Sequence, residues 1–135
     1  MTDEKKLPLS EVVLDASALL ALLNEEPGSD AVEKHLGTAS LSAVNLSEPV
    51  GQLIKRGMPE QTATAIVADL GLRVVPFDEQ QACATACLIP PTQKAGLSLG
   101  DRACLALAKQ LNAVALTADR SWTRISIGCK IKAIR

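Results

Sequence analysis

Val12-Val13-Leu14-Asp15-Ala16-Ser17-Ala18-Leu19-Leu20 places one acidic residue between two apolar runs. Val12–Leu14 is apolar and rich in β-branched residues, which predicts a buried strand, and the residues that follow predict a helix over 16–23. Asp15 therefore lies at the C-terminal end of a buried strand. In open α/β sheets, ligand sites form at this end of the strands. The stretch predicts an α/β fold and makes Asp15 a candidate site residue.

Three further segments bring a carboxylate to the edge of an apolar run. They are Ser42–Val50 around Glu48, Leu97–Leu107 around Asp101, and Ala113–Trp122 around Asp119. Four acids at one rim would repel one another unless a cation lay between them. Magnesium or manganese is the expected ion, because these hard cations prefer oxygen ligands and no set of His and Cys accompanies the acids.

Strand and helix patterns alternate along the chain from about residue 11. The expected strands are 12–14, 39–41, 73–76, 113–116 and 129–134; the expected helices are 16–23, 29–36 with Ser29 as N-cap, 43–55 with Ser42 as N-cap, 60–70, 78–88 and 99–111. Pro90-Pro91 predicts a loop over 89–96. This order predicts a mostly parallel central sheet flanked by helices, in a three-layer α/β/α domain.

Length and charge bound the possible functions. The 135 residues fit one domain, expected over 11–135, after a polar and poorly ordered lead-in over 1–10. The chain has 14 Lys and Arg against 15 Asp and Glu, a formal net charge of −1. Nothing in this balance attracts nucleic acid or anionic membrane generally, so a polyanion would need a local basic patch or a bound cation.

The N-terminal residues lack the apolar stretch of a signal peptide, and no segment has the length of a membrane span. The cysteines lie in apolar or helical contexts, which favours small buried side chains over disulfides or metal ligands; they are Cys83, Cys87, Cys104 and Cys129. We therefore expect a cytoplasmic protein.

Each acid also has a simpler explanation. Asp15 and Asp119 stand where helix caps are expected, and Ser98–Asp101 has the spacing of a capping box. Glu48 falls in mid-helix, where no capping role applies, and its simpler explanation is a solvated helix face. Asn45 is three residues earlier on the same side of that helix, so both side chains can line a site. One shared site explains all the acids together.

Four motifs of this chain together resemble the PIN-domain ribonucleases, and most closely the VapC toxins of bacterial toxin–antitoxin pairs. The motifs are Val13–Leu20, Asn45–Glu48, Leu97–Ala108 and Leu116–Trp122. The resemblance runs from about Val12 to the C-terminus. It implies that Asp15, Glu48, Asp101 and Asp119 form an acidic quartet that holds one or two magnesium or manganese ions. Ser17 is the supporting polar group by this resemblance, and Asn45 and Thr117 are further supporting candidates.

The resemblance also implies an activity and partners. PIN-domain toxins of this kind are endoribonucleases that cut single-stranded or looped RNA, are commonly homodimers, and are held inactive by an antitoxin that inserts a segment into the groove. Arg102, Arg120 and Arg124 are close in sequence to the acids and are candidate contacts for RNA phosphates. Pro49 departs from the family pattern, and we expect it to kink the helix locally and alter how Glu48 is presented.

Two other functions remain open from the sequence. A metal-dependent phosphatase commonly has a second acid close to the first, whereas Asp15 is followed by Ala16-Ser17. A regulatory module that binds RNA or protein without cleaving would need none of the acids. The intact quartet is the feature that speaks against this second alternative.

Overall fold

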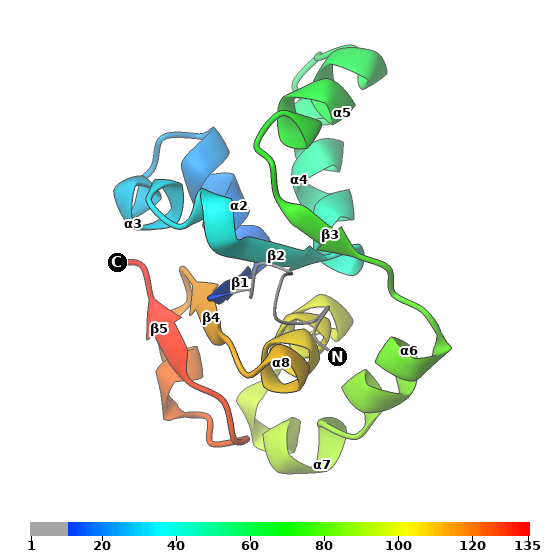
Figure 1. Ribbon diagram of the computed structural model, residues 1–135, viewed down its shortest axis with the longest axis vertical. Helices are drawn as coiled ribbons and strands as arrows, with labels where there is room; N and C mark the ends of the chain where they lie inside the picture. Colours follow the sequence, from blue (N-terminus) through cyan, green and yellow to red (C-terminus); the bar gives the residue numbers. More distant parts are fainter. Residues whose placement is uncertain (1–10) are drawn as a thin grey trace, which may run out of the picture.

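The structure is a computed structural model that describes residues 11–135; the expected lead-in lies outside the described residues. Its centre is one five-stranded sheet (Figure 1). The strands are β1 (Val12–Leu14), β2 (Ala39–Ser42), β3 (Arg73–Val75), β4 (Val114–Thr117) and β5 (Ile131–Ala133). All neighbouring pairs are parallel, and the spatial order is β3-β2-β1-β4-β5. The predicted parallel α/β sheet is confirmed.

Helices cover both faces of this sheet. They are α2 (Ala16–Leu23), α3 (Ser29–Glu33), α4 (Val44–Lys55), α5 (Glu60–Ala68), α6 (Glu79–Ala86), α7 (Ile89–Thr92) and α8 (Leu99–Leu111), with 3-10 turns η1 (Leu36–Thr38), η2 (Gln93–Ala95) and η3 (Arg120–Arg124). In Figure 1, α2 to α5 lie on one side of the strands and α6 to α8 on the other. The result is the three-layer α/β/α arrangement expected from the sequence.

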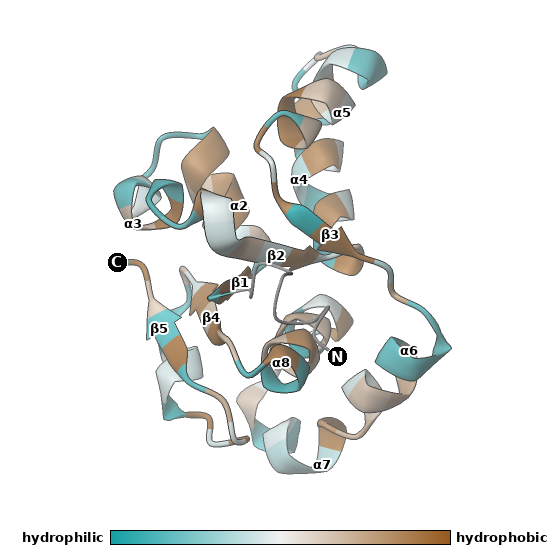
Figure 2. Cartoon of the chain, in the orientation of Figure 1, coloured by the Kyte–Doolittle hydropathy of each residue, from teal (hydrophilic) through white to brown (hydrophobic). Residues whose placement is uncertain are grey.

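Each face of the sheet has its own apolar core, because successive residues of a strand point to opposite faces. In β1, Val12 and Leu14 join a core with α2 and α3, whereas Val13 packs with α8. In β4, Leu116 and Ala115 divide between the two cores in the same way. Figure 2 shows both of these central strands as hydrophobic. Burial on both faces explains why these strands are short apolar runs.

Several element boundaries differ from those expected. The segment 89–96 is not a loop but contains α7 and η2. Pro90 and Pro91 fit α7 because residues in the first turn of a helix donate no intrahelical hydrogen bond, so their missing N–H groups cost nothing there. Ser29 is the first residue of α3 rather than its cap, which is Gly28 with φ 96°. A Cβ at Gly28 would lie 2.7 Å from the carbonyl oxygen of Ile134, so only glycine fits.

Other expectations concern exposure. Cys83 and Cys87 are exposed, which makes the prediction of buried side chains wrong for both, whereas Cys104 is fully buried. The helix through Pro49 is continuous from Val44 to Lys55. Within residues 11–135, no helix combines the length and the apolar character needed to cross a membrane.

The strand order fixes where a site can form. The chain builds β1, β2 and β3 outward in one direction and then returns to place β4 on the other side of β1. In open parallel sheets, this reversal opens a crevice at the carboxyl ends of the two central strands. Asp15 directly follows β1, and Thr117 is the last residue of β4. The reversal therefore brings two of the candidate residues side by side.

Candidate active site

A pocket of about 230 Å³ lies at the carboxyl ends of the two central strands. All four predicted acids line it, although they come from four separate segments of the chain: Asp15, Glu48, Asp101 and Asp119. Asn45, Ser17 and Ser98 are among the polar residues of the same lining. The pocket has no lysine or arginine in its lining among the described residues. No basic side chain of this lining therefore balances the negative charge of the four acids.

Asp15 is the buried acid of the pocket, with only 5% of its surface exposed. It occupies the N-cap position of α2 but makes no capping hydrogen bond, so the simpler explanation from the sequence does not account for it. Its Oδ2 atom instead accepts hydrogen bonds from the hydroxyls of Ser17, at 2.6 Å, and Thr117, at 3.0 Å. Two side-chain donors on one oxygen hold this carboxylate in a fixed orientation.

Burial raises the pKa of Asp15 above its ordinary value, because desolvation penalises the charged form. The hydrogen bonds from Ser17 and Thr117 oppose this rise, and the nearby charge of Asp101 adds to it. Raised pKa values from desolvation and a like charge are typical of sites that bind a cation or act on a proton.

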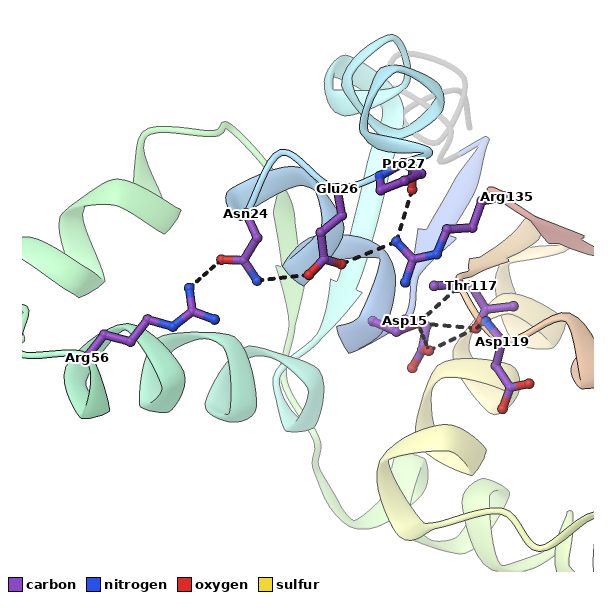
Figure 3. A network of polar contacts seen from close by, with 10 residues as sticks. Asp15, Asn24, Glu26, Pro27, Arg56, Thr117, Asp119 and Arg135 are labelled. Atoms are coloured by element: carbon purple, nitrogen blue, oxygen red, sulfur yellow. Dashed lines mark hydrogen bonds and ion pairs between the residues drawn. The ribbon is translucent and has the colours of Figure 1, made fainter.

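Thr117 links the ends of β1 and β4. Its hydroxyl donates to Asp15 and accepts the backbone N–H of Asp119 at 3.0 Å. Ser17 makes a parallel link, because its Oγ accepts the backbone N–H of Ala118 at 2.9 Å. Figure 3 shows Asp15, Thr117 and Asp119 joined in this way. The two hydroxyl residues therefore fix the spacing of the two strand-end acids.

Asp119 and Asp101 both act as local caps, which is the simpler explanation that the sequence offered for each of them. Asp119 Oδ1 accepts hydrogen bonds from both the backbone N–H and the hydroxyl of Ser121, at 3.0 and 2.7 Å. Asp101 Oδ2 accepts the backbone N–H of Ser98 at 2.9 Å, and the Ser98 hydroxyl accepts the N–H of Asp101, which completes a capping box. Capping and pocket lining are thus compatible.

The three aspartates share one feature. In Asp15, both hydrogen bonds from side chains fall on Oδ2; in Asp101 and Asp119, the capping hydrogen bonds fall on Oδ2 and Oδ1, respectively. Hydrogen bonds of this kind orient carboxylates that bind metal ions through their other oxygen.

The fourth acid comes from α4. Glu48 is exposed and makes no hydrogen bond or ion pair with another residue of 11–135. Asn45, one turn before it, is 2% exposed, and its Nδ2 donates to the backbone carbonyl of Gly100 at 3.2 Å. This bond ties α4 to the start of α8. The Oδ1 atom of Asn45 is buried without a hydrogen-bond partner, which is unusual for a native polar atom.

The donor set fits a hard divalent cation, because it consists of four carboxylates and an unpartnered buried amide oxygen, with neither His nor Cys in the lining. As the side chains stand in the described part of the chain, no three acidic, histidine or cysteine groups converge on one point within ligating distance. The structure therefore shows a negatively charged pocket of suitable chemistry, without a closed ligand shell.

The predicted phosphate contacts differ in what surrounds them. Arg102 donates from Nε to the hydroxyl of Thr92, at 2.9 Å, and from Nη1 to the carbonyl of Leu97, at 3.0 Å. These bonds hold the connection between α7 and α8 and favour a structural role for Arg102. The guanidinium groups of Arg120 and Arg124 are exposed on η3 and have no described partner. They stay candidates for binding phosphate.

The sequence interpretation missed one residue that holds the site together. Ser121 gives Asp119 both of its hydrogen bonds, and the signal for it was present as the spacing Asp-x-Ser, which is typical of a local turn. Trp122 is 1% exposed and also lines the pocket.

Comparison with known proteins identifies the fold family. The family model of the PIN domain matches residues 12–128. This chain belongs to the PIN-domain family. PIN domains are nucleases that hydrolyse phosphodiester bonds, generally with divalent metal ions, so membership supports this class of reaction. No match was found among curated proteins.

Solved structures similar to this PIN domain include several toxin–antitoxin complexes. A DNA-bound VapBC from Salmonella typhimurium has a chain that aligns with a TM-score of 0.71 and 18% identity, covering 94% of this chain and 100% of that one. VapBC2 from Rickettsia felis, bound to promoter DNA, aligns with a TM-score of 0.71 and 17% identity, covering 90% of this chain and 97% of that one. VapBC-5 from Mycobacterium tuberculosis aligns with a TM-score of 0.59 and 20% identity, covering 93% of this chain and 98% of that one. At these identities the similarity establishes a shared fold.

Proposed function

We propose that this PIN domain is an endoribonuclease that depends on magnesium or manganese and cleaves single-stranded or looped RNA. The observation that supports it most is the pocket itself: four carboxylates from four segments of the chain line it, and no described cation neutralises them. Carboxylates with no compensating charge are costly to bring together unless a cation binds among them. PIN-domain nucleases generally use a divalent cation of this kind for catalysis.

Asp15, Asp101 and Asp119 would hold the metal, each through the oxygen that its structural hydrogen bonds leave available. A divalent ion bound there supplies Lewis-acid stabilisation of the charge that develops on the phosphodiester. Ser17 and Thr117 fix Asp15 in orientation, and Thr117 also fixes Asp119. These contacts keep the ligands in place before substrate arrives, which avoids reorganisation during the reaction.

Glu48 has a different task in this proposal, because nothing described restrains it. It lines the pocket from α4 and can accept a proton from the attacking water. The water oxygen would bond to phosphorus in line with the leaving oxygen, whose bond to phosphorus breaks, and the leaving oxygen would take a proton from solvent. Asn45 positions this wall, since its bond to the Gly100 carbonyl joins α4 to α8.

We further propose that the chain is the toxin of a toxin–antitoxin pair, with a VapB-like antitoxin as partner and a homodimer as its own assembly. The solved structures with the same fold support this, since they include VapBC and other toxin–antitoxin complexes. The four cysteines are all unpaired, which is typical of a reducing compartment and supports a cytoplasmic location.

The test is cleavage of a panel of small structured and unstructured RNAs by the purified full chain, free of any partner. Reactions with magnesium, manganese and EDTA are compared with Asp15→Asn and Asp119→Asn. We expect cleavage with either metal, none with EDTA, and a loss of more than about 100-fold in each variant, since both remove a ligand. Asp69→Asn is the matched control: it makes the same chemical change at an exposed residue that follows α5.

Cleavage that persists in EDTA, or that both variants retain, would contradict a metal-dependent mechanism at this pocket. A folded wild-type chain that binds RNA and metal but cuts no RNA would instead favour the regulatory module considered from the sequence.

A further inference from the structure

A second pocket lies next to the active site and has the opposite charge. It occupies about 540 Å³ between α7, η2 and η3. Its lining consists of Pro91, Lys94, Ala95, Ser121, Arg124, Ile125 and Ser126. Lys94 and Arg124 are the two charged residues of this lining, so the pocket is purely cationic.

Ser121 joins the two pockets. Its side chain lines the cationic pocket, while its N–H and hydroxyl both bind Oδ1 of Asp119, which lines the acidic one. The acidic pocket and the cationic pocket are therefore adjacent, with Ser121 in contact with Asp119 of the first and part of the lining of the second.

Both cationic side chains are available to a ligand. Lys94 and Arg124 are exposed, and neither forms an ion pair or side-chain hydrogen bond with another residue of 11–135. Arg102 on the neighbouring helix provides a contrast, because its guanidinium is held by Thr92 and the Leu97 carbonyl. The fold thus uses one cation of this region internally and leaves two at the rim of a pocket.

The chemistry of the lining selects a phosphate backbone over bases. A guanidinium, an ammonium and the hydroxyl of Ser126 are groups that bind phosphate oxygens, whereas no aromatic side chain lines this pocket for base stacking. The acidic site next to it repels a polyanion, so a nucleic-acid substrate needs cationic contacts outside the site to stay bound.

We infer that the pocket formed by Lys94 and Arg124 binds the phosphates of the RNA strand that flank the cleaved bond, so that the strand leaves the active site along η3. This inference rests on the proposed ribonuclease function and adds a direction for the substrate. A further pocket, of about 580 Å³, shares Ile125 and Ser126 with this one and has Lys130 as its single charged lining residue. The strand therefore continues toward Lys130.

The test measures binding of a fluorescent single-stranded RNA to the full chain by anisotropy, over a range of salt concentrations. All binding proteins also contain Asp15→Asn, so that the RNA stays intact. The combined change Lys94→Gln and Arg124→Gln should weaken binding by about tenfold or more. It should also reduce the slope of log affinity against log salt by about 1.4, because each phosphate contact on a single strand contributes about 0.7.

The matched control is Arg73→Gln with Lys55→Gln. It removes the same two charges from exposed positions on β3, the opposite edge strand, and on the end of α4. We expect its salt slope to equal that of the parent. A second measurement uses chains with Asp15 intact, in which the Lys94 and Arg124 changes should lower kcat/KM for RNA by a similar factor while thermal unfolding stays unchanged.

A combined Lys94 and Arg124 variant that matches the control in slope, affinity and kcat/KM would overturn the strand path while leaving the proposed ribonuclease intact. A wild-type chain without metal-dependent cleavage would overturn the proposed function, and this inference with it.

Discussion

The two walls of the acidic pocket are built differently. On the strand side, Asp15 is buried and accepts hydrogen bonds from two hydroxyls that also connect β1 to β4. On the helix side, Glu48 is exposed and has no described partner. One wall is fixed before any ligand arrives, and the other has a free carboxylate on a helix that is itself well anchored.

This contrast separates two kinds of function in one site. A metal ligand is most effective when its orientation is fixed in advance, because no reorganisation is then needed on binding. A group that accepts a proton must instead follow a water molecule during the reaction, so freedom of movement is less harmful. We therefore interpret the strand side as the binding wall and Glu48 as the reactive group opposite.

Longer-range contacts hold the helix side in place. Arg56 at the end of α4 donates to Asn24 at the end of α2, at 2.7 Å, and Asn24 is in turn bonded to Glu26. Arg135 completes this chain of contacts by binding Glu26 and the Pro27 carbonyl, as Figure 3 shows. Most of these bonds are exposed and each is weak, yet together they link α2, α4 and Arg135.

The largest effect should come from Asp15→Asn, because it removes the buried charge of the binding wall. Metal affinity should fall more than about 100-fold, measured by calorimetry with manganese. The metal-free protein should become more stable by a few degrees in Tm, since Asn can still accept both hydroxyl bonds but carries no desolvated charge. A less stable variant would contradict the view that Asp15 is held at the expense of stability.

The pH dependence of this gain follows from the raised pKa of Asp15. The folded state binds the Asp15 proton more tightly than the unfolded chain, whose carboxyl has a pKa of about 3.9. Stability from this group is therefore greatest at low pH and is lost as the pH rises through the raised pKa. The difference in Tm between Asp15→Asn and wild type should therefore be largest at neutral pH. It should shrink as the pH falls through the raised pKa of Asp15 toward the unfolded value.

The second effect in size should be that of Glu48→Gln, which tests the other wall. If Glu48 accepts the proton of the attacking water, kcat should fall by about 100-fold or more, while manganese affinity changes far less than in Asp15→Asn. Stability should stay within about 0.5 kcal/mol, because no described contact is lost. Glu60→Gln, an exposed residue in the first turn of α5, is the matched control. An equal loss of metal affinity would make Glu48 a ligand instead.

The sequence predicted the strand side well because its signals are local. Asp15 and Asp119 each follow a short apolar strand within two residues, and parallel strands deliver their carboxyl ends to one edge. The position of Glu48 was harder to predict from the residues alone, since one polar face of a helix resembles another. From the residues, its place at a shared site rested on the apolar run around it and on the helix face that it shares with Asn45, and the family resemblance supported it. Helix α4 does bring Glu48 to the pocket.

The region after α6 was predicted least well, for a physical reason. Pro90-Pro91 was interpreted as a loop, although two prolines are equally compatible with the first turn of a helix. Without α7, nothing in the sequence pattern indicates that Arg102 bonds to Thr92, or that Lys94 and Arg124 line one pocket. These are contacts between segments, and neither periodicity nor spacing encodes them.

The smallest of the three effects should be that of Thr117→Val, which loosens the binding wall without removing an acid. The valine is close in size to the fully buried threonine, but Asp15 loses one of its two hydroxyl donors and the N–H of Asp119 loses its acceptor. Manganese affinity should fall by about 10- to 100-fold, the usual cost of removing a group that orients a metal ligand. Thr62→Val, at an exposed position on α5, makes the same chemical change away from the pocket.

The Thr117→Val variant also distinguishes the roles proposed for the two walls of the site. Loss of a donor to its carboxylate raises the pKa of Asp15 further, so more acid-sensitive metal binding should accompany the lower affinity. The rate at saturating metal should change much less than in Glu48→Gln, because Glu48, the proposed proton acceptor, is untouched. If Thr117→Val lowers kcat at saturating metal as much as Glu48→Gln does, the division into a binding wall and a reactive wall is wrong, and the pocket acts as one coupled unit.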